Sequence, residues 1–185
     1  MKWLDYVIRD WRIRKALPHL TEAKVILDIG CGDGELCRIL SKRGIVGVGI
    51  DACVNETFEA LGFEMISGSF PDALPNEKSF DAISMLAVLE HISEGQKLAF
   101  IKACHERLST DGVIVLTVPS PKVDVLLIVL RFLRLVDGMA FEEHHGFNPA
   151  QVEPLFESVG FNLLAHKTFQ FGLNNLFIFK KTNLI

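Results

Sequence analysis

The sequence predicts an α/β domain in which helices cover both faces of a mostly parallel sheet, the doubly wound arrangement. Residues 25–27 form a continuous apolar run, as expected for a strand that is buried on both faces. The run leads through Asp28 into a turn with Gly30, Gly32 and Gly34, after which helical spacing begins. Further along the chain, short apolar stretches keep alternating with helical ones, and this alternation is typical of doubly wound domains.

The length and composition fit a single folded domain over residues 1–185. The chain can bury a sizeable core, and no linker, repeat or low-complexity segment divides it. A formal net charge of −4 gives no basic surface of the kind that dominates nucleic-acid affinity, so we expect no nucleic-acid partner. The four cysteines form no C-x-x-C pair and no metal-site spacing, which indicates reduced cysteines in a cytoplasmic protein and no bound metal.

We also expect no stable insertion into a membrane. Charged residues interrupt the N-terminal segment, so this segment does not have the continuous apolar core of a secretory signal. The most apolar run, residues 125–130, is far shorter than the roughly 18 to 20 residues that span a bilayer.

An amphipathic helix is predicted near the N-terminus, over about residues 2–17. Apolar residues recur there at helical spacing, at Leu4, Val7, Ile8 and Trp11. Because a proline disfavours the helical conformation of the residue before it, the helix should end before Pro18. The charged face of this helix includes Asp5, Arg9 and Arg12. The pattern alone favours a helix packed on the body of the domain.

A second strand is predicted over residues 46–50, and it ends at Asp51. This carboxylate follows Gly34 by 17 residues (51 − 34 = 17), close to the roughly 20-residue offset at which an acidic residue binds ribose hydroxyls in βαβ nucleotide sites. Asp51 could alternatively cap the N-terminus of a helix over residues 52–61. Its position at the carboxyl end of a strand favours the ribose role.

The middle of the chain continues the alternation. Residues 63–66 form a weak third strand, and residues 79–86 form a fourth. A helix follows over residues 96–108, with an inner side that is predicted to carry Leu98, Ile101, Cys104 and Leu108. A glycine turn at residues 111–112 ends this helix before a fifth strand over residues 113–118.

An insert over about residues 121–147 contains an almost wholly apolar helix at residues 123–141. This helix could be a lid over an apolar substrate pocket, a homodimer surface, a helix on a membrane surface or an ordinary buried helix. His144 and His145 follow on a loop, where a neutral imidazole can accept a proton near pH 7 or simply hold the loop in place.

The last part of the chain is predicted to form one helix and two strands. The helix has a buried face made of Val152, Leu155, Phe156 and Val159. The strands cover residues 162–169 and 173–180 and are joined around Gly172.

The spacing of the first glycine turn separates two kinds of nucleotide ligand. In the dinucleotide fingerprint G-x-G-x-x-G the third glycine stands one residue later than Gly34 does here. Asp28, two residues before the first glycine, would repel the pyrophosphate of a dinucleotide. A carboxylate beside the turn suits a ligand with cationic groups, such as the ammonium and sulfonium of S-adenosylmethionine.

Three motifs carry a resemblance to a known family. The segment Asp28-Ile-Gly-Cys-Gly-Asp-Gly34 closely resembles motif I of the class I S-adenosylmethionine-dependent methyltransferases. Phe80-Asp81 resembles the step that opens the fourth strand of the family, and Leu89-Glu-His91 looks like the L-E-H signature of its small-molecule, methyltransferase type 11-like members. The resemblance implies a Rossmann-like sheet of seven strands in the order 3-2-1-4-5-7-6, with strand 7 antiparallel.

The resemblance also implies roles for particular residues. It implies that S-adenosylmethionine contacts the glycine turn, the end of the second strand, the loop after the third strand and the end of the fourth strand, at Asp28, Gly30, Cys31, Gly32, Gly34, Asp51, Ala52, Ser69, Phe70, Met85, Leu86 and Ala87. Phe70 could stack on the adenine or simply pack in the core. In the family, an N-terminal helix often covers the cofactor, so Trp3, Tyr6 or Trp11 could line the substrate side.

The expected activity is methyl transfer to a small, apolar acceptor. The candidates for orienting or deprotonating this acceptor are Glu90, His91, His144 and His145. His91 could alternatively make a structural hydrogen bond that holds its loop. Two other classes remain open, namely a non-catalytic cofactor-binding partner of another subunit and, less favoured by the glycine spacing, a nicotinamide oxidoreductase.

Overall fold

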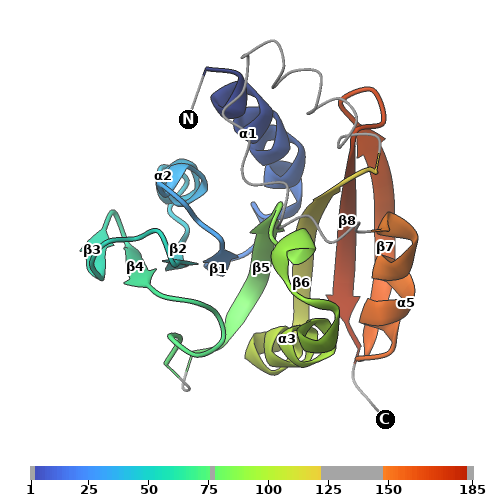
Figure 1. The fold of residues 1–185 in the computed structure, drawn as a ribbon. Helices are drawn as coiled ribbons and strands as arrows, with labels where there is room; N and C mark the ends of the chain where they lie inside the picture. Colours follow the sequence, from blue (N-terminus) through green and yellow to red (C-terminus); the bar gives the residue numbers. More distant parts are fainter. Residues whose placement is uncertain (1–2, 76–77, 122–147, 183–185) are drawn as a thin grey trace.

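The protein folds into an eight-stranded sheet with helices on both faces, as the doubly wound prediction required (Figure 1). The structure is a computed structural model that describes residues 3–75, 78–121 and 148–182. The strands are β1 Val25–Ile29, β2 Val46–Asp51, β3 Phe58–Ala60, β4 Phe63–Ser67, β5 Phe80–Leu86, β6 Leu108–Pro119, β7 Phe161–Phe169 and β8 Asn174–Lys181. The helices are α1 Trp3–Ala16, α2 Glu35–Ser41, α3 Glu94–Arg107 and α5 Val152–Glu157, with short 3₁₀ helices η1 Leu17–His19, η2 Leu89–His91 and η4 Pro149–Gln151.

The strand order is β3-β4-β2-β1-β5-β6-β8-β7. Without β3, this is the predicted seven-strand order, and the last strand, β8, is antiparallel to β6 as predicted. The additional edge strand β3 pairs antiparallel with β4 and lies within residues 52–61, which had been considered for a helix. Asp51 explains the difference, because its carboxylate caps a tight turn at Cys53 rather than a helix. The aromatic residue Phe58 then favours an extended backbone.

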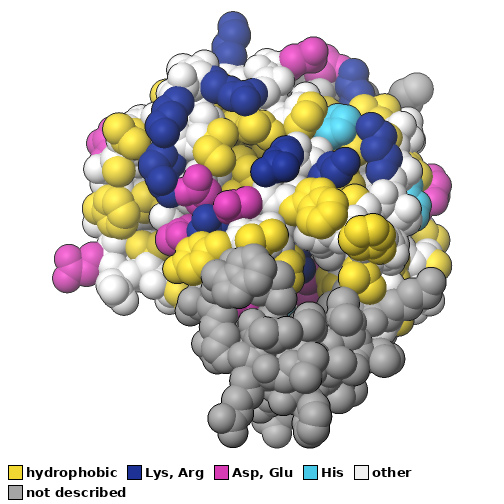
Figure 2. Space-filling view, turned by 90° about the horizontal axis from the view of Figure 1, so that it is seen from above, with side chains coloured by type: hydrophobic (Ala, Val, Ile, Leu, Met, Phe, Trp, Pro, Cys, Tyr) yellow, Lys and Arg dark blue, Asp and Glu magenta, His cyan; other side chains and the backbone are white. Residues whose placement is uncertain are grey.

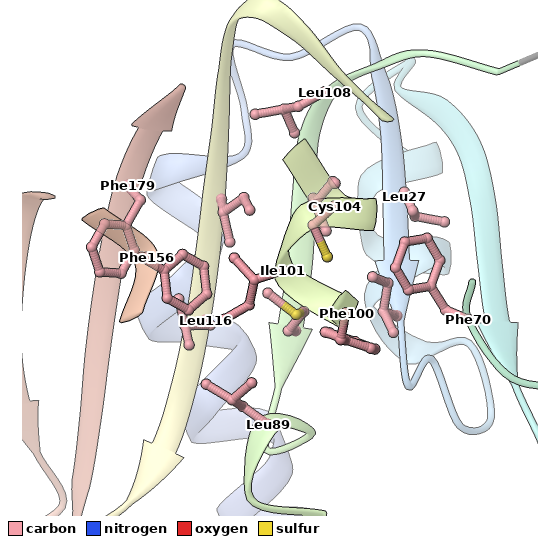
Figure 3. Close-up of a cluster of buried hydrophobic side chains, with 14 of the residues drawn as sticks. Leu27, Phe70, Leu89, Phe100, Ile101, Cys104, Leu108, Leu116, Phe156 and Phe179 are labelled. Atoms are coloured by element: carbon pink, nitrogen blue, oxygen red, sulfur yellow. The ribbon is translucent and has the colours of Figure 1, made fainter. Parts of the chain in front are cut away.

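Alternating side chains bury both faces of the sheet. Ile26 of β1 packs in a cluster with residues of α1 and α2, whereas its neighbour Leu27 packs in a second cluster with residues of α3 and α5. The same alternation holds for Ala82 and Ile83 of β5. Figure 3 shows the second cluster, in which side chains of α3 lie against the central strands. The continuous apolar strands predicted from the sequence are therefore covered on both sides.

The buried face of α3 differs from the prediction. Lys97 is only 2% exposed, whereas Leu98, predicted to face inward, is 42% exposed. The buried residues Lys97, Phe100, Ile101 and Cys104 are spaced as one helical stripe, shifted from the predicted one. Phe100 explains the shift, because burying its large ring against Phe70 removes more apolar surface from water than burying Leu98 would.

The strand β6 begins five residues earlier than predicted, at Leu108 rather than Val113. Leu108 pairs with Phe80 of β5, and an irregularity follows before regular pairing resumes at Ala82. A Cβ at Gly112 would lie 2.5 Å from Leu108 Cγ, so the glycine leaves room for the leucine side chain. The glycine turn expected at residues 111–112 therefore lies inside the strand.

The helix α1 ends at Ala16, close to the predicted boundary. Among the side chains of α1 that the structure describes, from Asp5 to Ala16, Ile13 and Ala16 are buried, whereas Tyr6 and Val7 are each 43% exposed. The inward face is thus concentrated in the C-terminal half of the helix. The apolar segment 123–141 lies outside the described residues, and among the described helices none is long and apolar enough to cross a membrane.

Candidate functional site

The glycine turn between β1 and α2 adopts a conformation that requires glycine. Gly30 and Gly34 have φ angles of +73° and +75°, in the left-handed region. A Cβ at Gly30 would lie 2.4 Å from Val88 Cγ2, so the loop after β5 closes directly over the turn. The residues predicted from two distant motifs therefore come together at the carboxyl end of the sheet, where open α/β sheets bind ligands.

Asp51 at the end of β2 holds the glycine turn in place. Its Oδ2 accepts a hydrogen bond from the Gly32 backbone N–H at 2.9 Å, and its Oδ1 accepts one from the Cys53 N–H at 2.7 Å. Because a carboxylate has about four lone-pair positions, Asp51 can still accept hydrogen bonds from ligand hydroxyls. The structure places Asp51 beside the turn, and its contact with a ribose stays a prediction.

Asp28 lies beneath the turn and is almost fully buried. Its Oδ1 accepts a hydrogen bond from Ser84 Oγ at 2.7 Å, and the Cys37 thiol donates to Oδ2 at 3.6 Å. Burial raises the pKa of Asp28 to about 7, although these two hydrogen bonds act in the opposite direction. With 3% exposure, Asp28 can influence a ligand mainly through its charge and through the shape of the turn.

Ser84 was not singled out in the sequence. It lies directly beside Asp28 in the β1–β5 register, and this pairing is what brings the two side chains together. In the sequence, the feature that could have pointed to Ser84 was its hydroxyl side chain within an otherwise apolar predicted strand. Cys31 also lies in the turn with its side chain buried, and burial raises the pKa of its thiol.

The loop after β4 approaches the same region from the other side. The Gly68 N–H donates a hydrogen bond to the Asp51 carbonyl at 3.1 Å, and this bond joins the loop to the end of β2. The next residue, Ser69, is exposed. Ala52 is also exposed there. The ring of Phe70, in contrast, is buried against Phe100 with a centroid distance of 5.2 Å (Figure 3). Phe70 thus takes the core-packing position that was the alternative to adenine stacking.

A pocket of about 320 Å³ opens next to the turn. Its wall is formed by Gly32, Asp33, Val54, Asn55, Glu56, Phe58 and Met65. The size is at the lower end of the range for small-molecule sites. The residues between Val54 and Phe58 were not singled out in the sequence, where this segment was considered only as an alternative helix and the turn that leads into β3 was not recognised.

The end of β5 and the loop that follows it lie beside the glycine turn. Met85 is fully buried in the core, whereas Leu86 and Ala87 are half-buried. Ala87 has a φ of +63°, and its N–H donates to the Thr117 carbonyl at 3.0 Å. A non-glycine residue in this region costs about 1 to 3 kcal/mol, and such strain is concentrated at functional sites. Leu86 and Ala87 are therefore better placed than the Met85 side chain to contact a ligand.

Glu90 and His91 lie together on η2, immediately after the β5 loop. Glu90 is only 1% exposed, and its Oε2 has no hydrogen-bond partner among the described residues. Burial raises the pKa of Glu90 to about 7, while its own backbone N–H, Arg12 and Lys97 lower it. His91 is half-buried. Neighbouring residues of a 3₁₀ helix point about 120° apart, so the two side chains face different surroundings.

The helix α1 also contributes residues of its charged face to this end of the sheet. Arg9 donates to Asp33 of the glycine turn at 2.7 Å. Arg12 is half-buried, donates through Nε to Asn174 Oδ1 at 3.4 Å and is attracted electrostatically by Glu90. The charged face of α1, which carries Arg9 and Arg12, therefore lies against the carboxyl end of the sheet.

Seen from this end, acidic and basic side chains lie intermixed with hydrophobic ones (Figure 2). His144 and His145 lie outside the described residues, so their position relative to Glu90 stays a prediction. Within residues 3–75, 78–121 and 148–182, no group of three or more His, Cys, Asp or Glu side chains could hold a metal ion.

The arrangement can bind a cationic, ribose-containing ligand and can accept a proton near neutral pH. The residues of the turn fit S-adenosylmethionine, because the buried carboxylate of Asp28 lies beneath the turn and the carboxylate of Asp51 lies beside Gly32. A raised carboxyl pKa near 7 suits Glu90 to general base chemistry at neutral pH.

Known proteins resemble this chain in sequence and in fold. Residues 2–166 match the methyltransferase domain family. The chain is 29% identical over 154 residues to the ubiquinone biosynthesis O-methyltransferase of Psychrobacter arcticus, which covers 75% of this chain and 59% of that protein. It is 30% identical over 117 residues to the protein of the same name from Pelagibacter ubique, with 59% and 47% covered. The chain spans about half the length of these curated relatives.

Among solved structures, the fold is similar to that of the Burkholderia thailandensis 1,6-didemethyltoxoflavin-N1-methyltransferase, whose crystal structure contains 1,6-didemethyltoxoflavin and S-adenosylhomocysteine. The TM-score is 0.67 at 17% identity, with 93% of this chain and 77% of that chain covered. This structural similarity supports the assignment of a methyltransferase-like α/β fold to the chain. Because the family match extends over most of the sequence, the chain belongs to the methyltransferase domain family.

Proposed function

We propose that this chain binds S-adenosylmethionine and transfers its methyl group to a small, apolar acceptor. The observation that carries the proposal is the contact between Gly32 and Asp51, which combines a glycine turn with a carboxylate at the end of the next strand. S-adenosylmethionine, when bound, supplies an electrophilic methyl group on a cationic sulfur. The names of the curated relatives favour an oxygen of the acceptor as the methylated atom.

The residues of the chain divide into those that hold the donor and those that handle the acceptor. Asp28 and the turn favour the cationic methionine end, and Asp51 accepts hydrogen bonds from the ribose hydroxyls. Ala52 and Ser69 lie on the adenine side, and most of the catalytic effect comes from positioning the two reactants.

Glu90 is our first choice for the residue that accepts the proton of an acceptor hydroxyl. Its Oε2 is buried and has no partner among the described residues, as expected of a group whose partner is a ligand. His91, His144 and His145 are the other candidates. The segment 121–147 would act as a lid that keeps water away from the reacting groups.

The biological setting is also proposed rather than observed. We favour a cytoplasmic protein that acts on a small molecule, without a nucleic-acid partner. As an alternative to a lid, residues 123–141 would form the interface of a homodimer.

Calorimetric titration with S-adenosylmethionine and S-adenosylhomocysteine, followed by a methyl-transfer assay with a panel of phenols and hydroxyquinones, tests the proposal. We expect binding of both compounds and methylation of at least one acceptor. Absence of donor binding would overturn the proposal. Binding without transfer to any acceptor would favour a non-catalytic partner of another subunit.

A further inference from the structure

The apolar stripe predicted for α1 is not the face that packs on the core. Of its members whose side chains the structure describes, Val7 is 43% exposed, and Ile8 and Trp11 are half-buried. The buried side chains in the described part of the helix are instead Ile13 and Ala16. The core thus leaves much of the stripe uncovered, and such a surface is available to a partner outside the domain.

The tight turn between β7 and β8 adds an aromatic ring to this stripe. Phe171 is 95% exposed, and its ring meets the ring of Trp11 edge to face, with a centroid distance of 6.4 Å. Gln170, Phe171 and Gly172 have left-handed backbone, with φ angles of +51°, +59° and +80°. This conformation is unfavourable for glutamine and phenylalanine, so the chain keeps a large ring in water at a cost in stability. Because strain of this kind is concentrated at functional sites, the exposed ring indicates a contact outside the folded domain.

Hydrogen bonds of Gln170 hold the turn against α1. The Gln170 side chain donates to the Ile8 carbonyl at 3.5 Å and accepts a hydrogen bond from the Asn174 amide. The exposed ring of Phe171 is therefore fixed beside the helix. We call the surface that the helix and the turn form together the aromatic patch, which consists of Val7, Trp11 and Phe171.

Exposed cations border the aromatic patch. Arg14 and Lys15 stand three and four residues after Trp11, so they share its side of the helix. Lys167 of β7 stands two residues before Phe169, which packs in the cluster with α1, so both lie on the α1 side of the sheet. Within the described part of the chain, none of these three cations forms an ion pair with a carboxylate.

This local positive charge is opposite to that of the whole chain, whose formal net charge is −4. Asp10 of α1 is also exposed, but it is paired with Arg9 at 2.8 Å. Figure 2 looks onto this end of the molecule and shows Lys and Arg side chains next to hydrophobic ones. Aromatic side chains next to Lys and Arg are the combination by which helices lie on anionic membrane surfaces. The charge of the patch therefore favours a negatively charged lipid surface as its partner.

We propose that the aromatic patch docks the protein on the surface of an anionic lipid bilayer. Trp11 and Phe171 enter the boundary between headgroups and acyl chains, and the cations around them attract the lipid phosphates. Docking of this kind is peripheral and needs no membrane-spanning helix. The proposal does not depend on methyl transfer, so it can fail or succeed separately from the proposed function.

Cosedimentation of the full chain with lipid vesicles tests the proposal. The vesicles contain phosphatidylcholine alone or an equimolar mixture with phosphatidylglycerol. We expect binding to the mixed vesicles that weakens in high salt, with a loss of about fivefold in Phe171→Ser and about tenfold in the double variant Arg14→Gln, Lys15→Gln. Leu98→Ser is the matched control, because Leu98 is 42% exposed on α3, which packs in the other cluster of the core, and it should leave binding unchanged.

Absence of binding to the mixed vesicles would overturn the proposal. Equal binding of the native chain and Phe171→Ser would also overturn it, because another surface would then hold the lipid. Circular dichroism checks that the variants are folded, and Phe171→Ser and the double variant change only exposed side chains.

Two further measurements locate the contact. Trp3→Phe leaves Trp11 as the only tryptophan, and its emission should move to shorter wavelengths when mixed vesicles are added. Unchanged emission in the bound protein would contradict the proposal. Analytical ultracentrifugation without lipid should give the same oligomeric state for the native chain and Phe171→Ser. A dimer that dissociates in Phe171→Ser would assign the patch to a second copy of the chain instead.

Discussion

Arg9 of the N-terminal helix donates a hydrogen bond to Asp33 of the glycine turn at 2.7 Å. The two residues are 24 positions apart, and their side chains are 24% and 54% exposed. The ion pair links α1 directly to the turn that we propose to hold the donor. It is partly exposed, so solvent screens much of its strength.

The first prediction concerns this link. Arg9→Ala and Asp33→Ala should each lower the free energy of unfolding, with a coupling between them of about 0.2 to 1 kcal/mol that weakens in high salt. A double-mutant cycle from urea unfolding at low and high salt measures the coupling. Arg14→Ala is the control on the same helix, and a coupling that does not change with salt would contradict the ion-pair interpretation.

The second prediction concerns the closed space above Gly30. Gly30→Ala should cost about 1 to 2 kcal/mol for the left-handed backbone alone, and more because its Cβ would overlap Val88. Gly32→Ala has the same backbone cost but meets no atom within 4 Å, so it is the matched control. Combining Gly30→Ala with Val88→Ala should recover part of the lost stability and donor affinity. If the double variant recovers nothing, the left-handed backbone, and not the overlap with Val88, causes the loss of stability in Gly30→Ala.

The third prediction concerns Asp51. Asp51→Ala removes the acceptor of the Gly32 and Cys53 N–H groups, and we expect donor affinity to fall by about 1 to 3 kcal/mol. Asp51→Asn keeps one oxygen and should lose less. Calorimetry with S-adenosylhomocysteine measures both variants, and unchanged affinity in Asp51→Ala would remove this residue from the site.

The fourth prediction is a dependence of stability on pH that comes from Asp28. Its pKa in the folded protein, about 7, lies above the ordinary value of 3.8, so the folded state binds more protons than the unfolded state between these values. The contribution of Asp28 to stability is therefore complete below about pH 4 and decreases as the pH rises through 7. Glu90 contributes in the same direction, with an ordinary value of 4.5.

Urea unfolding at pH 5 and pH 8 tests this dependence. We expect Asp28→Asn to gain stability relative to the native protein at pH 8 and to show a smaller difference between the two pH values. Asp72→Asn, at an exposed position, serves as the control. If Asp28→Asn keeps the full native pH dependence, the burial of Asp28 does not control its ionisation.

Local patterns in the sequence were sufficient for the central strands and the turn. The apolar run before Asp28 and the glycines after it predicted β1, the turn and α2, because burial on both faces and left-handed backbone each require particular residue types. The strand ending at Asp51 was predicted for the same reason. These features depend on a few neighbouring residues, so they can be recognised without the rest of the chain.

The sequence by itself thus determined the doubly wound fold, the turn and the type of ligand that the turn can hold. Only the tertiary structure decided that Phe70 packs on Phe100, that Lys97 rather than Leu98 is buried, and that Arg9 pairs with Asp33. The physical reason is that burial and electrostatic environment depend on which distant segments pack together. Helical spacing identifies the faces of a helix, but the neighbouring elements decide which face is covered and what charge it meets.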